Sequence, residues 1–229
     1  CLEAIKNPNR QINKIILTQN SLNFLKEKLP ASILEKTNIE IIAPLKIEQI
    51  IRKQLKKDVT HQGIILETKE LQPPPLEELI SHNKPLILLD KITDPQNIGA
   101  IIRSAAAFNA AAVITEERNS PPENATIAKT SAGMIEKMPY LRVKNFNHIL
   151  DDIKDEGFQI IGLDGNCEKT LNEIEKDSKT VFIIGSEGKG LSDRLKKHCD
   201  YITKINISDK VESLNASVAC AIALYSISL

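Results

Sequence analysis

The stretch that decides the fold is TVFIIGSEGKGLS (residues 180–192), an apolar run that leads into a turn with three glycines. An apolar run bounded by glycine predicts a buried strand, and the glycines after it let the backbone approach a ligand closely. The turn contains Glu187, which would repel a phosphate. It also lacks the Gly-Lys-Ser/Thr ending of a nucleotide-binding P-loop and the spacing of a dinucleotide fingerprint. A glycine turn alone is weak evidence for a site, so its meaning depends on the rest of the chain.

Similar apolar runs recur along the chain and alternate with stretches that have a helical pattern. Near-continuous apolar strands separated by helices predict an α/β fold, in which a parallel sheet is covered by helices on both faces. In the C-terminal part we predict strands at 85–90, 111–115, 158–164, 180–185 and 201–207, and helices at 95–109, 123–131, 146–156, 191–198 and 213–228.

The segment ELQPPPLEELISHNKP (residues 70–85) divides the chain. Three consecutive prolines favour a stiff, extended connection. We therefore predict an N-terminal domain over 1–69, a linker over 70–84 and a C-terminal domain over 85–229. The N-terminal part, with predicted strands at 12–18, 39–44 and 63–68 and predicted helices at 21–29 and 46–57, is a small α/β module.

The composition excludes several classes of protein. With 30 Lys and Arg against 30 Asp and Glu, the formal net charge is zero, which argues against a strongly basic, non-specific nucleic-acid binder. The basic run RKQLKK (52–57) is either a solvated helix face or a contact for a polyanion. No apolar stretch approaches the roughly 20 residues that span a bilayer. The four cysteines have no metal-ligand spacing, which predicts no metal site and favours reduced thiols in a cytoplasmic protein over a disulfide.

Two further segments have the composition of a site. In DPQNIGAIIR (94–103), Asp94 is a good helix N-cap, and Asn97 lies at the mouth of the helix beyond a strand end, where α/β sheets bind ligands. Arg103 follows six residues later, roughly 240° around the helix, so it faces elsewhere. The alternative is that Asn97 only caps the helix and that Arg103 forms a surface ion pair.

The other segment is VESLNASVACAIAL (211–224), near the C-terminus. Ser213 or Asn215 can cap the helix that follows, and its alanines allow another backbone to pack closely. The alternative is a terminal helix without a site.

Along the chain, about 80 residues separate DPQNIGAIIR from the glycine turn, and about 25 separate that turn from SLNAS (213–217). This order and spacing resemble the signature motifs of the SpoU/TrmH family of the SPOUT superfamily. Its members are RNA ribose 2'-O-methyltransferases. The family's motifs correspond to Asp94–Gly99 with Arg103, to Gly185–Gly190 and to Ser213–Ser217. In addition, THQGII (60–65) is similar to the end of the substrate-binding domain of the RlmB-type 23S rRNA guanosine-2'-O-methyltransferases.

The resemblance implies a fold and a cofactor. It predicts a C-terminal SPOUT domain with a deep trefoil knot, S-adenosylmethionine bound in the knot between two subunits of a homodimer, and an N-terminal domain with a ribosomal-protein-like RNA-binding fold. A sulfonium cofactor carries no phosphate, so it tolerates the glutamate in the turn. Carried over by position, the cofactor-binding residues are Gly162, Leu163, Gly185, Gly188, Ile205 and Leu214, and the catalytic residues are Asn97, Arg103, Glu187, Ser213 and Asn215.

The sequence departs from the family pattern in the cofactor loop, where Asn206 replaces a frequent proline and Asp209 an expected glycine. Because a guanidinium does not deprotonate in proteins, we interpret Arg103 as a phosphate clamp that orients the ribose, not as the base. The predicted substrate is large-subunit rRNA. The alternatives are a tRNA ribose methyltransferase and a non-catalytic RNA-binding or ribosome-assembly protein with the same fold.

Overall fold

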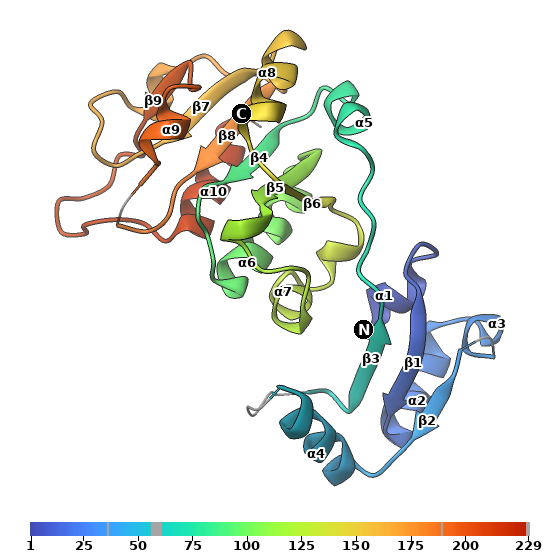
Figure 1. The fold of residues 1–229 in the computed structure, drawn as a ribbon. Helices are drawn as coiled ribbons and strands as arrows, with labels where there is room; N and C mark the ends of the chain where they lie inside the picture. The colour runs from blue at the N-terminus through green and yellow to red at the C-terminus, as the bar shows by residue number, and fades with distance from the viewer. Residues whose placement is uncertain (36, 56–60, 189, 228–229) are drawn as a thin grey trace. The chain divides into compact units, whose positions relative to one another are not determined.

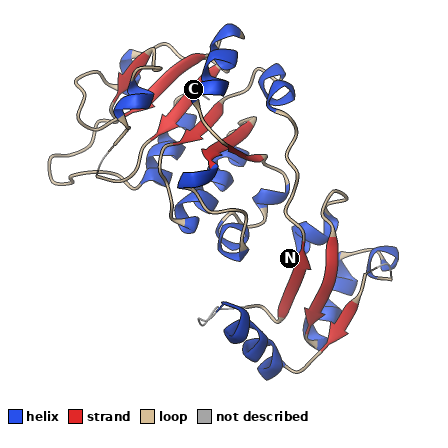
Figure 2. Ribbon diagram, viewed as in Figure 1, coloured by secondary structure: helices blue, strands red, loops and turns tan. Residues whose placement is uncertain are grey.

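The computed structural model describes residues 1–35, 37–55, 61–188 and 190–227. The chain divides into two compact units, Cys1–Gln72 and Pro73–Leu229 (Figure 1). Each unit has its own sheet, drawn in red in Figure 2. Each also has its own buried core.

The N-terminal unit is built on a three-stranded sheet in the order β2-β1-β3. Strand β2 pairs in parallel with β1, and β3 pairs antiparallel to it. The alternating apolar residues Ile15 and Leu17 of β1 pack on Leu22 and Leu25 of helix α2. The elements are α1 (Leu2–Lys6), β1 (Ile12–Leu17), α2 (Gln19–Lys28), α3 (Ala31–Leu34), β2 (Ile39–Ile41), α4 (Pro44–Leu55) and β3 (Ile64–Thr68).

The segment His61–Gly63 docks on the start of α2. The Ser21 hydroxyl donates a hydrogen bond to the Gln62 carbonyl at 3.0 Å, and the Thr18 N–H donates to the Gly63 carbonyl at 2.9 Å. Thr18 also caps α2, because its hydroxyl oxygen accepts the Ser21 N–H at 3.2 Å. Thr60, the first residue of the predicted THQGII motif, lies outside the described residues.

The C-terminal unit contains a six-stranded sheet in the order β6-β5-β4-β8-β7-β9, and every pair in it is parallel. This confirms the α/β class and the parallel sheet. Its strands are β4 (Leu86–Leu89), β5 (Ala112–Glu116), β6 (Tyr140–Val143), β7 (Gln159–Leu163), β8 (Thr180–Ile184) and β9 (Tyr201–Thr203). Its α-helices are α5 (Leu76–Ser81), α6 (Pro95–Ala107), α7 (Ala125–Thr130), α8 (Asn147–Asp155), α9 (Asp193–Lys196) and α10 (Ala216–Tyr225), and three short 3-10 turns lie at Glu117–Asn119, Met134–Glu136 and Leu171–Glu173.

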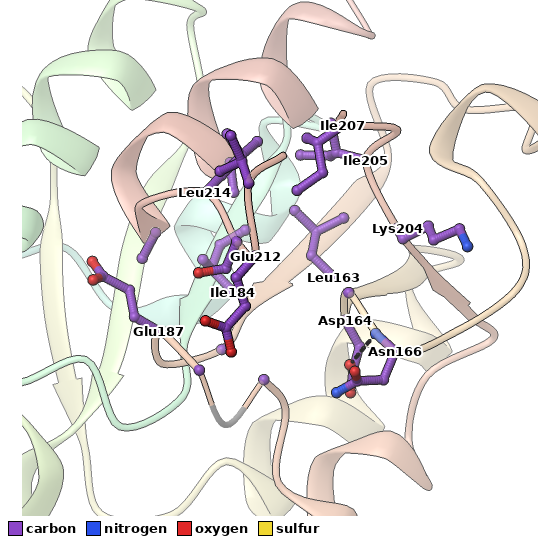
Figure 3. Close-up of a pocket in the computed structure, with 18 of the residues that line it drawn as sticks. Leu163, Asp164, Asn166, Ile184, Glu187, Lys204, Ile205, Ile207, Glu212 and Leu214 are labelled. Carbon is purple, nitrogen blue, oxygen red and sulfur yellow. Dashed lines mark hydrogen bonds between the residues drawn. The ribbon is translucent and has the colours of Figure 1, made fainter. Parts of the chain in front are cut away.

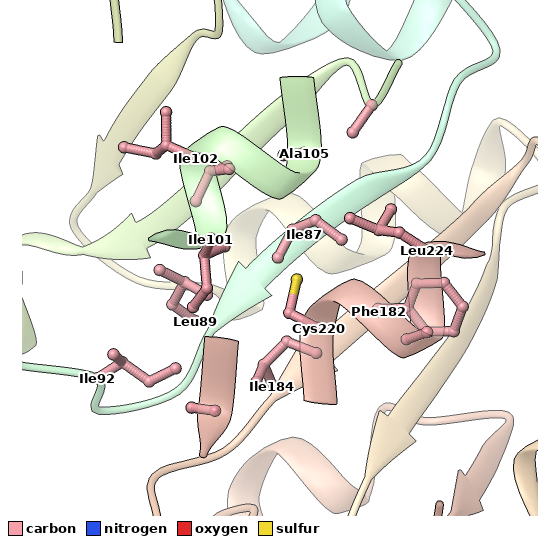
Figure 4. Close-up of a cluster of buried hydrophobic side chains, with 14 of the residues drawn as sticks. Ile87, Leu89, Ile92, Ile101, Ile102, Ala105, Phe182, Ile184, Cys220 and Leu224 are labelled. Carbon is pink, nitrogen blue, oxygen red and sulfur yellow. The ribbon is translucent and has the colours of Figure 1, made fainter. Parts of the chain in front are cut away.

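Successive residues of β4, β5, β7 and β8 enter different cores, because side chains alternate between the two faces of a sheet. Ile87 and Leu89 of β4 join one core with helices α6, α7 and α10 (Figure 4). Leu86 and Leu88 join the other, with α5, α8 and α9. Burial on both faces explains why these strands read as continuous apolar runs.

The structure corrects two predicted boundaries and adds one strand that was not predicted. The linker predicted over 70–84 contains α5, whose Leu79 and Ile80 are buried in the core of the C-terminal unit. The predicted strand 201–207 ends at Thr203, after which the chain leaves the sheet as a loop that reaches Asn215. Strand β6 was not predicted, since it is a four-residue edge strand that includes an arginine and is too short for a periodic signal.

Candidate functional site

A cavity of about 470 Å³ opens beyond the carboxyl ends of β7, β8 and β9. Its size lies in the usual range of small-molecule sites. Three segments that are distant in the sequence line it, namely 163–166, 184–188 with Gly190, and the loop after β9 (Figure 3). Because all the strands are parallel, their carboxyl ends meet at one edge, so loops that follow different strands come together there.

The glycine turn forms one wall of the cavity. The Gly190 N–H donates to the Ser186 carbonyl at 3.0 Å, which closes the turn. A side chain at Gly185 would collide with the backbone carbonyl of Gly190, so only glycine permits this close approach. Gly188, at the tip, has a positive φ of 74°. The sequence stretch therefore forms a narrow backbone wall rather than a surface of side chains.

The lining combines apolar side chains with an acidic rim. Leu163 and Ile184 are buried at the strand ends, and Ile205 and Leu214 are half-buried beside them (Figure 3). The charged side chains among the described lining residues are Asp164, Glu187, Lys204, Asp209 and Glu212. Carboxylates outnumber the single ammonium among these described residues, although Asp164 is paired with Lys196, so this part of the lining suits a cation better than a polyphosphate.

Asp164 is the most buried of these carboxylates, at 3% exposure. Its Oδ1 accepts the Asn166 N–H at 3.0 Å, and its Oδ2 lies 2.6 Å from the Lys196 ammonium. Burial alone would raise the pKa of Asp164, but the Lys196 ammonium and the N–H groups of Asn166 and Leu191 together outweigh it, so the pKa lies below its ordinary value. Asp164 is therefore ionised at neutral pH.

A hydrogen-bonded network joins the three sequence motifs at the edge of the cavity. The Asn97 amide donates to Glu187 Oε1 at 3.0 Å. The Asn215 amide donates to the same oxygen at 2.8 Å and to Asn97 Oδ1 at 2.9 Å. One residue from each motif thus takes part, although 90 and 118 positions separate Asn97 from the other two along the chain.

Side-chain caps fix the starts of the two helices beside this network. Asn215 caps α10, since its Oδ1 accepts the Ser217 N–H at 2.9 Å. Asp94 caps α6 by accepting the Gln96 N–H at 3.0 Å, and Pro95 occupies the first turn, as predicted. Of the two candidate caps for the C-terminal helix, Asn215 holds that position and Ser213 lies in the preceding loop. Each motif therefore has a local role and a tertiary role.

The structure brings most of the predicted site residues together. The lining of the cavity includes Leu163, Gly185, Glu187, Gly188, Ile205, Ser213 and Leu214. Asn97 and Asn215 adjoin it through the network. Arg103 lies exposed on α6, where it forms no hydrogen bond or ion pair with the described part of the chain. Its side chain is available to a ligand or to another subunit.

Gly162, like Arg103, lies outside the cavity lining. The side chain of β7 that reaches the cavity is that of Leu163, and the residue before it faces the opposite side of the sheet. There a Cβ on Gly162 would collide with Leu191 and Cys199, so this glycine makes room for the residues on either side of α9. Gly162 thus has a packing role, and its contact with the cofactor stays a prediction.

Several lining residues were missed by sequence reasoning. Asp164, Asn166, Lys204, Ile207 and Glu212 all line the cavity. Asp164 had a signal, because it directly follows an apolar strand at the ligand-binding edge. The two departures from the family pattern, Asn206 and Asp209, are exposed and also line the cavity.

The described residues contain neither a membrane-spanning helix nor a metal-binding cluster of side chains. They include no helix that is long and apolar enough to cross a membrane. They also include no group of three or more His, Cys, Asp or Glu side chains that could hold a metal ion. None of the four cysteines, all of which lie within the described part, forms a disulfide.

Comparison with known proteins agrees with the geometry. Residues 84–225 match the SpoU rRNA Methylase family. A putative TrmH family tRNA/rRNA methyltransferase of Bacillus subtilis is 30% identical, over 99% of this chain and 91% of its own length. An uncharacterized tRNA/rRNA methyltransferase of Synechocystis is 34% identical over 96% of this chain. The chain spans only 44 to 58% of the length of that protein and of two mycobacterial relatives.

The fold also matches solved structures. The SpoU methyltransferase AviRb of Streptomyces viridochromogenes, in complex with AdoMet, superposes with a TM-score of 0.78 at 20% identity. The match covers 97% of this chain and 84% of that one. Fold, motif geometry and sequence similarity lead to one conclusion: the chain belongs to the SpoU/TrmH methyltransferase family.

Proposed function

We propose that this chain transfers a methyl group from S-adenosylmethionine to the ribose 2'-hydroxyl of an RNA nucleotide, a guanosine of large-subunit (23S) rRNA. The observation that carries the proposal is the network of Asn97, Glu187 and Asn215, which joins the three family motifs beside one cavity. Family membership supports methyl transfer as the reaction.

The cavity suits S-adenosylmethionine in size and charge. About 470 Å³ is sufficient for a cofactor of this size, and the backbone of Gly185 and Gly188 offers polar groups without side-chain bulk. Leu163, Ile205 and Leu214 supply apolar surface for an adenosine. The cofactor's sulfonium, which makes its methyl group electrophilic, carries a positive charge that the acidic rim favours.

The chain must also align the ribose hydroxyl with the methyl group of the bound cofactor. Such alignment accounts for much of the rate acceleration when two bound groups react. We assign Arg103 to this task. Its exposed guanidinium can hold an RNA phosphate by two parallel hydrogen bonds, and it remains charged at any physiological pH. Asn97, Glu187 and Asn215 hold the glycine turn and the start of α10, while Ser213 lines the entrance as a further polar contact.

We propose that the N-terminal unit binds the RNA. Its mixed α/β fold and the docked His61–Gly63 segment agree with the resemblance to the RlmB-type domain. Arg52 and Lys53 of the basic run are exposed on α4, whereas Lys56 and Lys57 lie outside the described residues. Specific RNA recognition can rely on such a local basic surface and on shape, so a net charge of zero is compatible with it.

We further propose that two copies form a homodimer in the cytoplasm and that the C-terminal chain is threaded as the family's trefoil knot. Val218, Ile222 and Tyr225 form an apolar stripe on α10 with exposures of 46, 37 and 53%. A second copy of this helix would cover the stripe. Support for the threading comes from α10, which packs against α6 and β8, and from the loop before it, which returns to the glycine turn.

Calorimetry and a methylation assay test the proposal together. The purified chain should bind S-adenosylmethionine and make a ribose in a 23S rRNA transcript resistant to alkaline cleavage. Arg103→Ala should abolish turnover and leave cofactor affinity within about twofold, because the side chain lies outside the cavity lining. Methylation of tRNA but not of rRNA would show that the substrate is tRNA. Absence of cofactor binding would favour a non-catalytic RNA-binding protein.

A further inference from the structure

Three buried carboxylates lie at the edge of the sheet where the cavity opens. Asp90 follows β4, Glu116 ends β5 and Asp164 follows β7, and their exposures are 2, 1 and 3%. In the sheet, β4 and β7 flank β8, from which the glycine turn emerges. Buried carboxylates are costly unless they are paired and hydrogen-bonded, so their partners matter.

All three carboxylates bond to one short stretch, Ser192–Lys196, which contains α9. The Ser192 N–H donates to Asp90 Oδ2 at 2.7 Å. Arg194 Nη2 donates to Glu116 Oε1 at 2.8 Å, and the Lys196 ammonium lies 2.6 Å from Asp164 Oδ2. We call these three pairs the α9 clamp.

In addition to Glu116, Arg194 bonds to two asparagines, which makes the clamp more rigid. Arg194 Nη1 also donates to Asn145 Oδ1 at 2.9 Å and to Asn147 Oδ1 at 3.0 Å, at the start of α8. Burial alone would raise the pKa of Glu116, but bonds from the Phe146 N–H and from Arg194 outweigh it, so the pKa lies below its ordinary value. Glu116 is therefore a charged anchor at neutral pH.

Helix α9 has only four residues, far fewer than an isolated helix needs to be stable. Its position thus depends on tertiary contacts, namely Leu195 in the core and the three polar pairs. The glycine turn ends two residues before Ser192, and its glycines give it many accessible backbone conformations. The contacts that hold α9 in place therefore also restrain Gly190, at the C-terminal end of the turn.

We propose that Asp90, Glu116 and Asp164 are positioning residues, which hold the glycine turn in its cofactor-binding conformation through α9. The inference rests on the proposed function of the cavity, and it goes beyond that function because Asp90, Glu116 and Arg194 lie outside the cavity lining. If the turn is in the binding conformation for only a fraction of the time, the apparent dissociation constant rises in inverse proportion to that fraction.

Arg194→Met tests the clamp at the pair that is remote from the cavity. Loss of a hydrogen bond between charged groups should weaken S-adenosylmethionine binding about tenfold, while turnover at saturating cofactor stays within about twofold. Lys197→Met is the matched control, because Lys197 is the exposed neighbour of α9. Arg194→Lys, which keeps the charge, should bind with intermediate affinity. An unchanged affinity in folded Arg194→Met would overturn the proposal.

A cofactor-free measurement separates the clamp from the proposed function. Amide hydrogen exchange at Gly190 and Ser192 should accelerate about tenfold in Arg194→Met and stay unchanged in Lys197→Met. Should Arg194→Met fail to fold, Ser192→Pro removes the donor to Asp90 at a φ of −67°, which proline accepts, and Gly190 exchange should accelerate there instead. Unchanged exchange in whichever variant folds refutes the clamp. If the unaltered protein binds no cofactor but its variants show faster exchange, the proposed function fails and the clamp stands.

Discussion

The contact between Asn215 and Glu187 can be tested by an isosteric change, Asn215→Asp. Aspartate keeps the oxygen that accepts the Ser217 N–H and is as good an N-cap as asparagine, so the start of α10 should persist. The change replaces the amide that donates to Glu187 at 2.8 Å and to Asn97 at 2.9 Å with a second carboxylate. Two attractive contacts are lost, and one repulsive contact is created.

The expected loss of stability follows from these contacts. A hydrogen bond contributes about 1 kcal/mol on average, and like charges near 3 Å in a well-solvated setting repel by a similar amount. Because Glu187 and Asn215 are both exposed, solvent reduces each contribution, and we expect a total loss of about 1–2 kcal/mol at pH 7. In the Glu187→Gln background, glutamine restores an amide donor opposite the new carboxylate, so the loss should fall below about 0.5 kcal/mol.

Equilibrium urea unfolding of the four proteins in this double-mutant cycle measures the coupling between positions 187 and 215. Added salt should reduce the loss in Asn215→Asp, because salt screens exposed charges. An equal loss in both backgrounds would show that the two side chains do not interact. The three motifs would then lie near one another without being bonded.

Other consequences of the structure can be measured independently. Gly185→Ala should abolish S-adenosylmethionine binding in calorimetry while far-UV circular dichroism stays native, since the new Cβ collides with the Gly190 carbonyl in the turn and not with the core; retained affinity would contradict this account. The lowered pKa of Glu116 gives stability that is present above about pH 4, the pKa in the unfolded chain, and is lost as pH falls through the folded value. Glu116→Gln should therefore show a flatter dependence of melting temperature on pH between about 5 and 3 than the unaltered protein, and parallel curves would exclude this contribution. Cys220 is fully buried and burial raises the pKa of its thiol to about 12, so iodoacetamide should modify the exposed Cys1 in the native protein and Cys220 only after unfolding, as mass spectrometry can show.

The alternation of strands and helices could be predicted from sequence because it is a local property. Strands β4, β5, β7 and β8 are buried on both faces, and such strands need continuous apolar residues that are visible in the chain. The cap at Asp94 and the glycines of the turn were visible for the same reason, since each acts on backbone within a few residues. Strand β6 and helix α5 were missed because their short segments carry too few residues for periodicity to stand out.

The site residues were predicted as separate motifs, and the family resemblance gave them a common function. Their contacts depend on strand order, which brings the carboxyl ends of β7, β8 and β9 to one edge and which no local pattern encodes. The packing role of Gly162 was hidden for the same reason, because which face of β7 meets the cavity is decided by what packs on each face.

The sequence by itself determined the α/β class, the two-part organisation and the chemical groups available for a site. Only the tertiary structure decided that Asn97, Glu187 and Asn215 share hydrogen bonds, and that three buried carboxylates hold α9. The physical reason is that hydrogen bonds and ion pairs act over a few ångströms. Their existence therefore depends on where the folded backbone places residues that lie a hundred positions apart.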